Sequence, residues 1–388
     1  MVSDTGTSGR RPRARELGIA IGDLEPGPHN AITDVPGVGV GHCTLVRGEG
    51  ALVVGRGPVR TGVTVVVPHD GDVVEPVCAG AHRLNGNGEM TGLEWIRETG
   101  LLRWPIGITN THSVGVVRDA LIGLEVESRP MGAVAWVLPV VAETWDGRLN
   151  DINGMHVRPE HVAQARGAVS HDVVDEGSVG GGTGTVAFGF KGGSGTASRL
   201  VPVAGIGGQA TYRVGVLVQA NFGRRPRFRV NGVPIGKLIP AEEVPLPGPP
   251  RRPDPPPGAG SVIVIAATDA PLLPHQCERV AQRIALGIGR LGGAGENSSG
   301  DLFLCFATGN RGFAELDPAR HTDLTSTLRT LNDDYIDPLF YAVIEATEEA
   351  VLNAMLAAET MTGRDGLTAH ALPAERLVEL LDRYRAQA

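Results

Sequence analysis

Short apolar runs, many of them interrupted by glycine, dominate the first two thirds of the chain. Four of these runs predict strands, at 38–46, 62–68, 133–141 and 212–220. They are continuous in hydrophobicity more than alternating, which is typical of strands in a sheet that is covered on both faces. Helical patterns come between them, for example at 92–99 and 159–165. This part of the chain therefore predicts sheets with helices packed on them.

The last third repeats the same elements with longer helices. A strand is predicted from Ser261 to Ala266, an amphipathic helix through 278–285, and a second strand at 302–307. The segment 338–356 has apolar residues at spacings of three and four, which predicts a long helix, and 374–384 predicts a final one. Sheets buried on both faces and flanked by helices indicate a layered α/β sandwich.

Two segments fall outside this pattern. Residues 1–12 are polar and are expected to form a disordered arm, and the remaining 13–388 to form a single catalytic domain. A proline-rich linker covers residues 244–260. Such a sequence favours the stiff, solvated polyproline conformation and holds the residues that follow it in an accessible loop.

Composition excludes several classes of protein. The formal net charge of −8 argues against a nucleic-acid or anionic-membrane partner. No apolar run approaches the ~18 residues of a membrane-spanning helix, and no secretory signal is visible, so a cytoplasmic location is expected. The four cysteines have no metal-ligand or CxxC spacing and are expected to be reduced thiols in or near the core.

Common catalytic motifs are absent, while two glycine motifs allow more than one interpretation. The chain has no GxSxG, Walker A or HExxH sequence. Residues 287–292 match GxGxxG, but they follow a helix and indicate a helix end with a glycine cap. The tract 177–185 is typical of a tight turn where backbones pack closely, or of an amide cradle for an anion.

The junction between Gly260 and Ser261 is the most informative position. A linker ends there and a buried strand begins with a hydroxyl side chain. These two residues alone favour an ordinary loop entering a strand. Cleavage before Ser261, however, would place its Oγ beside a new α-amine, which titrates near ~8 and can act as a base.

Several further segments resemble one family. In order along the chain they are Arg13–Gly18, Asn30–Gly41, Asn85–Gly92, Thr109–Gly115, Glu143–Asp151, Gly260–Leu272 and Ser298–Leu304. Together they are similar to the DmpA-type L-aminopeptidase/D-Ala-esterase/amidases and β-peptidyl aminopeptidases, which are self-processing N-terminal-nucleophile hydrolases. The resemblance implies a four-layer αββα sandwich, self-cleavage into 1–260 and 261–388, and a homo-oligomer, a tetramer of αβ units.

The resemblance also implies roles for particular residues. Ser261 is the nucleophile of both self-cleavage and catalysis, assisted by its α-amine and by the pair Ser299 and Asp301. These two residues face the same way in a strand, because side chains alternate with a period of two. Asn221 supplies the oxyanion-hole amide. Members commonly carry Glu where this chain has Asp301.

The implied substrate carries a free amino group. Glu143 corresponds to the carboxylate that holds the substrate ammonium, and two residues later Trp145 replaces a tyrosine that assists the oxyanion hole. An indole N–H donates from a different place and cannot accept a hydrogen bond, so the substrate preference of the family is not transferred to this chain. Short peptides, amino-acid amides or esters are the expected substrates.

No metal or organic cofactor is implied, and several other functions stay open. An oligoamide hydrolase of the nylon type is one, although those members have threonine at the junction. An amine acyltransferase on the same fold is another. The departures at Asp301 and Trp145 would suit an uncleaved, non-catalytic binding protein, and the tract 177–185 would suit a binder of small anionic ligands.

Overall fold

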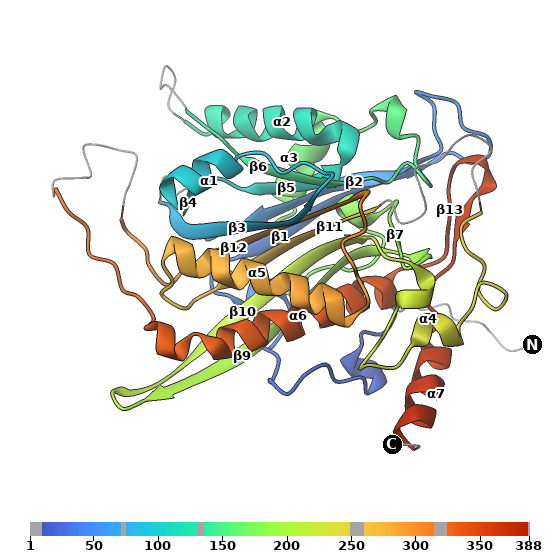
Figure 1. The fold of residues 1–388 in the computed structure, drawn as a ribbon. Coiled ribbons are helices and arrows are strands. Elements are labelled where there is room, and N and C mark those ends of the chain that lie inside the picture. The colour runs from blue at the N-terminus through green and yellow to red at the C-terminus, as the bar shows by residue number, and fades with distance from the viewer. Residues whose placement is uncertain (1–9, 71–74, 130–135, 249–259, 314–323, 387–388) are drawn as a thin grey trace, which may run out of the picture.

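Two β-sheets form the centre of the computed structural model, which describes residues 10–70, 75–129, 136–248, 260–313 and 324–386 (Figure 1). The smaller sheet has the strand order β1-β2-β5-β6, with bounds Gly39–Arg47, Val59–Val67, Ile106–Asn110 and Val140–Thr144. The larger sheet has the order β4-β3-β12-β11-β10-β9, with bounds Leu101–Leu102, Val77–Gly86, Ser299–Ala307, Gly260–Thr268, Gly208–Asn221 and Gly193–Gly205. Only the pairs β5–β6 and β11–β12 are parallel among the pairs of these two sheets.

Helices cover the outer face of each sheet (Figure 1). Helices α2 (Val114–Glu127) and α3 (Pro159–Gly167) pack on the smaller sheet, and α5 (Pro274–Arg290) and α6 (Asp337–Ala357) pack on the larger one. The arrangement is a four-layer αββα sandwich, as expected. The remaining helices are α1 (Leu93–Thr99), α4 (Ile235–Leu238) and α7 (Ala374–Arg385), and short strand pairs are β7 (Val186–Ala187) with β8 (Phe190–Lys191) and β13 (Met361–Thr362) with β14 (Thr368–Ala369).

The continuous apolar strands are explained by cores on both of their faces. Along β11, Ile263 and Ile265 belong to the core between the two sheets, whereas Val262 and Val264 belong to the core under α5 and α6. Because side chains alternate along a strand, each face of β11 needs its own apolar residues. The β-branched residues of this run also fit the pleated, crowded surface of a central strand.

Most predicted elements are found, and one strand was placed wrongly. The strand predicted at 133–141 begins only at Val140, since residues 136–139 are not in a sheet and 133–135 lie outside the described residues. Pro139 has no N–H for a sheet ladder. Trp136 packs instead edge-on against Trp95 and Trp104, with ring centroids 4.6 and 5.8 Å away. Within this run, Trp136 belongs to an aromatic cluster and not to a strand.

Both glycine motifs have the conformations expected of backbone turns. The tract 177–185 packs closely against other backbone: a Cβ at Gly182 would lie 2.3 Å from the amide nitrogen of Ser194, and one at Gly184 would lie 2.1 Å from the carbonyl oxygen of Arg60. Helix α5 ends at Arg290, and Gly292 has a φ of +97°, so the GxGxxG match is a helix end. All four cysteines are free and buried.

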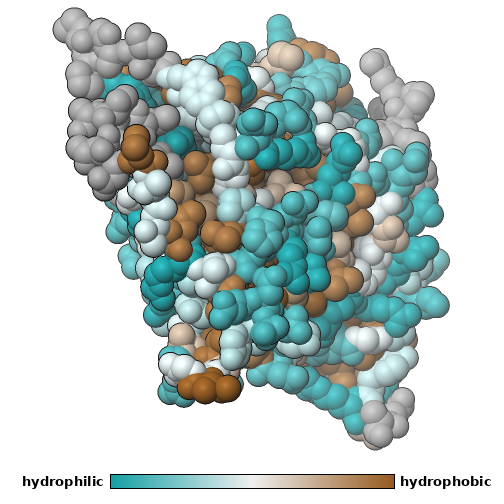
Figure 2. Space-filling view, turned by 60° about the vertical axis from the view of Figure 1, so that its left-hand side comes forward, coloured by the Kyte–Doolittle hydropathy of each residue, from teal (hydrophilic) through white to brown (hydrophobic). Residues whose placement is uncertain are grey.

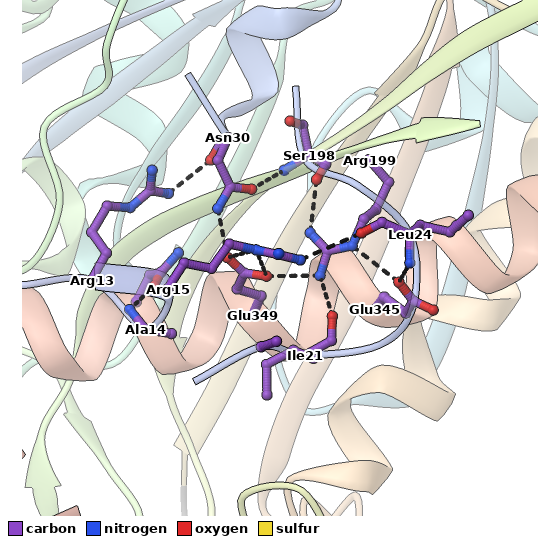
Figure 3. Close-up of polar contacts among 12 residues, drawn as sticks. Arg13, Ala14, Arg15, Ile21, Leu24, Asn30, Ser198, Arg199, Glu345 and Glu349 are labelled. Carbon is purple, nitrogen blue, oxygen red and sulfur yellow. Dashed lines mark hydrogen bonds and ion pairs between the residues drawn. The ribbon is translucent and has the colours of Figure 1, made fainter. Parts of the chain in front are cut away.

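Polar side chains of the N-terminal segment contact helix α6, which lies near the other end of the chain (Figure 3). Arg199 of β9 is fully buried and forms ion pairs with Glu345 at 3.0 Å and Glu349 at 2.7 Å, both on α6. Arg15 also contacts Glu349, at 3.1 Å, and Asn30 donates a hydrogen bond to the same carboxylate. Residues from the N-terminal segment, from β9 and from the long C-terminal helix thus form one polar network in the interior.

The ends of the expected arm and linker are partly described. Residues 1–9 of the expected arm and 249–259 of the proline-rich linker lie outside the described residues. Arg11 donates a hydrogen bond of 2.9 Å to the carbonyl oxygen of Leu372. Among the residues that the structure describes, no helix is long and apolar enough to cross a membrane.

Candidate active site

A cavity of about 310 Å³ lies where β11 begins, and we call it the nucleophile cavity. It brings together the predicted cleavage site, Gly260 and Ser261, with Glu143 and Trp145, which lie more than a hundred residues earlier in the chain. The rest of its lining comes from the loop after β3, from the end of β5 and from the residue before β12: Asn87, Gly88, Glu89, Thr111 and Ser298.

Ser261 is placed by its position in the middle of the larger sheet. It pairs with Asn221 of the antiparallel neighbour β10 and with Gly300 of the parallel neighbour β12. Its side chain is 3% exposed and lies on the face of β11 that points between the two sheets. At Gly260, a Cβ would lie 2.3 Å from the carbonyl oxygen of Asn221, so only glycine fits immediately before the serine.

Asn221 is the last residue of β10, and both ends of its side-chain amide are held. Its Oδ1 accepts a hydrogen bond of 2.9 Å from the backbone N–H of Val186, and its Nδ2 donates one of 2.7 Å to the carbonyl oxygen of Trp145. These two contacts fix which way the amide points. Because an amide nitrogen carries two hydrogens, one donor remains after the bond to Trp145.

Ser299 and Asp301 meet as expected, but on the opposite face of the sheet from the Ser261 side chain. The Ser299 hydroxyl donates a hydrogen bond of 2.6 Å to Oδ1 of Asp301, and both side chains are buried. Neither lines the nucleophile cavity. In the sheet, Ser299 pairs with Gly260, and the Val262 amide hydrogen-bonds the Asp301 carboxylate. The pair therefore lies beside the backbone of the predicted cleavage site.

Burial raises the pKa of Asp301 to about 6. Its hydrogen bond from Ser299 acts in the opposite direction, while nearby Glu296 adds to the increase. The carboxyl group thus holds its proton more strongly than an exposed aspartate does, because desolvation penalises the charged form. The pairing of β12 with β3 has a bulge directly after Asp301, where Leu84 of β3 is the extra residue.

Glu143 lies on β6, and each of its carboxylate oxygens has a donor. Oε1 accepts a hydrogen bond of 3.0 Å from the backbone N–H of Glu89, and Oε2 accepts one from the Thr111 hydroxyl. Burial raises its pKa, while these two hydrogen bonds work against the increase. Each oxygen keeps further lone pairs, and Glu143 lines the cavity, which suits a carboxylate that receives a cationic group.

Trp145 forms the boundary between the nucleophile cavity and a second cavity of about 360 Å³. The half-buried indole contributes to the lining of both, and Asn221 contributes to the second. Gly147 leaves the space for the ring, because a Cβ there would lie 2.6 Å from the indole Cζ2. Besides its side chain, the carbonyl of this residue holds the Asn221 amide.

The sequence offered no signal for two buried titratable side chains, the residue after Trp145 and a lysine on β8. Asp146 and Lys191 are both fully buried, and burial shifts the pKa of each to about 7, upward for the carboxyl and downward for the amine. The Lys191 ammonium donates hydrogen bonds to the carbonyls of Gly182 and Gly192, at 3.2 and 2.8 Å. These contacts hold the Lys191 side chain against the glycine tract.

Thr111, Glu89 and Gly88 were also missed as site residues. All three lie inside segments that carried the family resemblance, Asn85–Gly92 and Thr109–Gly115, so the signal was present without an assigned role. The space at Gly88 is limited, because a Cβ there would lie 3.0 Å from Oε1 of Glu143. Within the described ranges, no three or more His, Cys, Asp or Glu residues are grouped to hold a metal ion.

Comparison with known proteins supports the resemblance. The model of peptidase family S58 matches residues 30–369. A β-peptidyl aminopeptidase from Sphingosinicella microcystinivorans is 47% identical, and the match covers 100% of this chain and 96% of the relative.

Two solved structures are also similar. A β-aminopeptidase from a Burkholderia species has a TM-score of 0.85 and 49% identity, over 96% of this chain and 99% of the other. The L-aminopeptidase D-Ala-esterase/amidase of Ochrobactrum anthropi, described as a variant of the Ntn hydrolase fold, has a TM-score of 0.85 and 41% identity. That match covers 97% of this chain and 100% of the other.

Proposed function

The chain belongs to peptidase family S58 and is a hydrolase, and from this premise we propose that it is a self-processing serine aminopeptidase or amidase. It cuts its own chain between Gly260 and Ser261 and then removes N-terminal residues from short peptides, amino-acid amides or esters. The observation that carries the proposal is that Ser261, the first residue after the cut, shares one cavity with the buried carboxylate Glu143.

Self-cleavage begins with attack of Ser261 Oγ on the carbonyl carbon of Gly260. The C–N bond between the two residues breaks, an ester to Oγ forms, and the proton of Oγ ends on the released amine. Water then hydrolyses the ester, which leaves a carboxylate on Gly260 and a free α-amine on Ser261. The fragments are residues 1–260 and 261–388. Glycine at 260 suits this step, because the backbone of β10 approaches it closely.

Substrate hydrolysis uses the groups that self-cleavage creates. The α-amine accepts the Oγ proton, and its titration near ~8 makes it an effective base at neutral pH. The Ser299 hydroxyl donates a hydrogen bond of 2.6 Å to Asp301. The Ser299 oxygen can therefore accept a hydrogen bond from the α-amine of Ser261, which lies on the neighbouring strand. The free N–H of Asn221 steadies the oxyanion, a contribution of about 3 kcal/mol to the barrier in comparable sites.

Glu143 selects substrates with a free amino terminus. The substrate ammonium binds its carboxylate in the nucleophile cavity, and the adjacent acyl carbon then faces Ser261. Ser261 Oγ forms an ester with this carbon, the amide C–N bond breaks, and the amine leaves with the proton. Water hydrolyses the acyl-enzyme and restores Ser261. No step requires a metal or an organic cofactor.

Denaturing intact-mass measurement tests the proposal. The wild type is expected to give fragments of 260 and 128 residues, and Ser261→Ala a single chain of 388. The cleaved enzyme should hydrolyse at least one amide of L-, D- or β-alanine. Glu143→Gln keeps the shape of the side chain and removes its charge, so KM should rise more than tenfold. An intact wild-type chain after prolonged incubation would refute the proposal.

The cytoplasmic location and the homo-oligomeric assembly are further parts of this proposal. Four free, buried thiols suit a reducing compartment. Figure 2 shows hydrophobic residues exposed among hydrophilic ones on the side that is turned forward. Several large apolar side chains of the described residues are solvent-exposed, including Ile206, Leu324, Leu328 and Tyr341. Such residues support contacts between copies of the chain.

A further inference from the structure

Two cavities of opposite charge meet at Trp145. The nucleophile cavity carries the carboxylates Glu89 and Glu143, and its described lining contains no arginine, lysine or histidine. The second cavity, which we call the arginine cavity, is lined by Arg148, Arg224 and Arg225 and has no acidic residue in its described lining. The predicted nucleophile lines the first cavity and Asn221 lines the second. Ser261 and its strand partner Asn221 thus line two cavities of opposite charge.

One of the three positive charges of the arginine cavity belongs to a buried arginine that is fixed by backbone hydrogen bonds. Arg225 is buried, and its guanidinium donates hydrogen bonds to the carbonyl oxygens of Phe188, Gly189, Ile239 and Val244 at 2.7–3.1 Å. Burial lowers its pKa to about 10, which leaves it charged at neutral pH. Because its donors are engaged with backbone, Arg225 contributes charge to the cavity. Arg148 and Arg224 add their charges to the lining of the same cavity.

Arg148 and Arg224 follow the site residues at equal distances along the chain. Arg148 lies three residues after Trp145, and Arg224 lies three residues after Asn221. Arg148 is half-buried, with a long contact of 3.5 Å from its Nη1 to the carbonyl of Gly248, and Arg224 is exposed. A guanidinium presents paired N–H donors that match both oxygens of a carboxylate.

We infer that the arginine cavity binds the carboxylate of the leaving part of the substrate, so that free short peptides are preferred over their C-terminal amides. The inference rests on the proposed function, in which Glu143 holds the ammonium and the amine product leaves on the other side of Ser261. A short peptide has its two charges at opposite ends, and the two cavities match this distribution. The leaving group of a simple amino-acid amide is ammonia and does not extend into the arginine cavity.

The test compares three substrates with the same N-terminal residue. These are alanyl-alanine, alanyl-alaninamide and alaninamide. The first residue of all three is the form of alanine, L-, D- or β-, that the enzyme hydrolyses. In the wild type, kcat/KM for the free dipeptide should exceed that for its amide by about tenfold to a hundredfold. The double variant Arg148→Gln/Arg224→Gln should lose this preference, mainly through KM for the dipeptide, and should hydrolyse alaninamide within about twofold of the wild-type rate.

A matched control and a second readout accompany the kinetics. Arg227→Gln removes an exposed arginine of the same loop that does not line the cavity, and it should keep the preference. Propionate, which has a carboxylate and no amine for Glu143 to bind, should inhibit dipeptide hydrolysis more weakly in the double variant than in the wild type.

The outcomes distinguish this inference from the proposed function. Equal rates for dipeptide and amide in the wild type, or a preference that survives in the double variant, would overturn the carboxylate site while alaninamide hydrolysis still supports the aminopeptidase. Failure of the cleaved enzyme to hydrolyse any of the three substrates would refute both.

Discussion

Asp301 is a carboxyl group held where its charge is costly to the fold. Its pKa is about 6 in the uncleaved chain, against 3.8 for an ordinary aspartate. Between these values the folded state keeps a proton that the unfolded state has lost, so stability falls as pH rises through this window. The change amounts to at most about 3 kcal/mol, which the protein accepts to keep an acid beside Ser299.

Asp301→Asn should therefore stabilise the chain at high pH more than at low pH. We compare the free energy of unfolding of Asp301→Asn with that of the protein that keeps Asp301, both in the uncleaved Ser261→Ala background. The difference between the two should shift in favour of the Asn variant by about 2–3 kcal/mol from pH 4 to pH 7.5. Urea unfolding at the two pH values measures it. Asp334→Asn, at an exposed acid, is the control. A pH-independent effect at Asp301 would contradict the buried, proton-binding carboxyl.

At the scale of elements, a glycine on β9 allows a close approach between a strand and a helix. A Cβ at Gly195 would lie 2.2 Å from the carbonyl oxygen of Ala350 and 2.5 Å from the amide nitrogen of Ala354, both on α6. The neighbours are helix backbone, which cannot turn aside as a flexible side chain does. The layer of α6 therefore packs directly on the backbone of the larger sheet.

Gly195→Ala should push β9 and α6 apart and lower the free energy of unfolding by about 1–3 kcal/mol, the usual cost of overpacking. Gly207→Ala, in the turn between β9 and β10, has no atom within 4 Å of the new Cβ and should be close to neutral. Urea unfolding in the Ser261→Ala background compares them. Equal effects at the two positions would show that β9 and α6 do not pack as described.

At the scale of the whole molecule, the two fragments that the proposed cleavage would create are interleaved. Strands β11 and β12 of the second fragment lie between β10 and β3 of the first, within one sheet. The ion pairs of Arg15 and Arg199 with Glu349 also join residues from both fragments in the interior. Separation would break a central sheet and leave buried charges without partners, which is strongly unfavourable.

The cleaved protein should consequently stay together in native buffer. Light scattering is expected to give a multiple of the 40.5 kDa chain mass with both fragments present, while denaturing mass spectrometry separates them. Uncleaved Ser261→Ala should show the same native mass. Loss of either fragment from the native particle on size-exclusion chromatography would contradict the interleaved arrangement.

A layered α/β sandwich and most of its elements were predictable from the sequence pattern, because continuous apolar runs and helical spacing record burial on two faces. The order of the four layers was implied by the family resemblance. The strand expected at 133–141 was wrong in its first part. Trp136 packs against Trp95 and Trp104 and not in a sheet. Hydrophobicity alone does not distinguish a sheet core from an aromatic cluster.

From the sequence, the family resemblance predicted the residues of the candidate site, which are Ser261, Asn221, Glu143 and the Ser299–Asp301 pair. Tertiary structure decided how they are combined. It placed Ser299 and Asp301 beside the backbone of Gly260 instead of in the cavity, made Trp145 a wall between two cavities, and gathered three arginines on one side of it. Charge and burial at a site depend on the distances between remote segments, and those distances exist only in the folded chain.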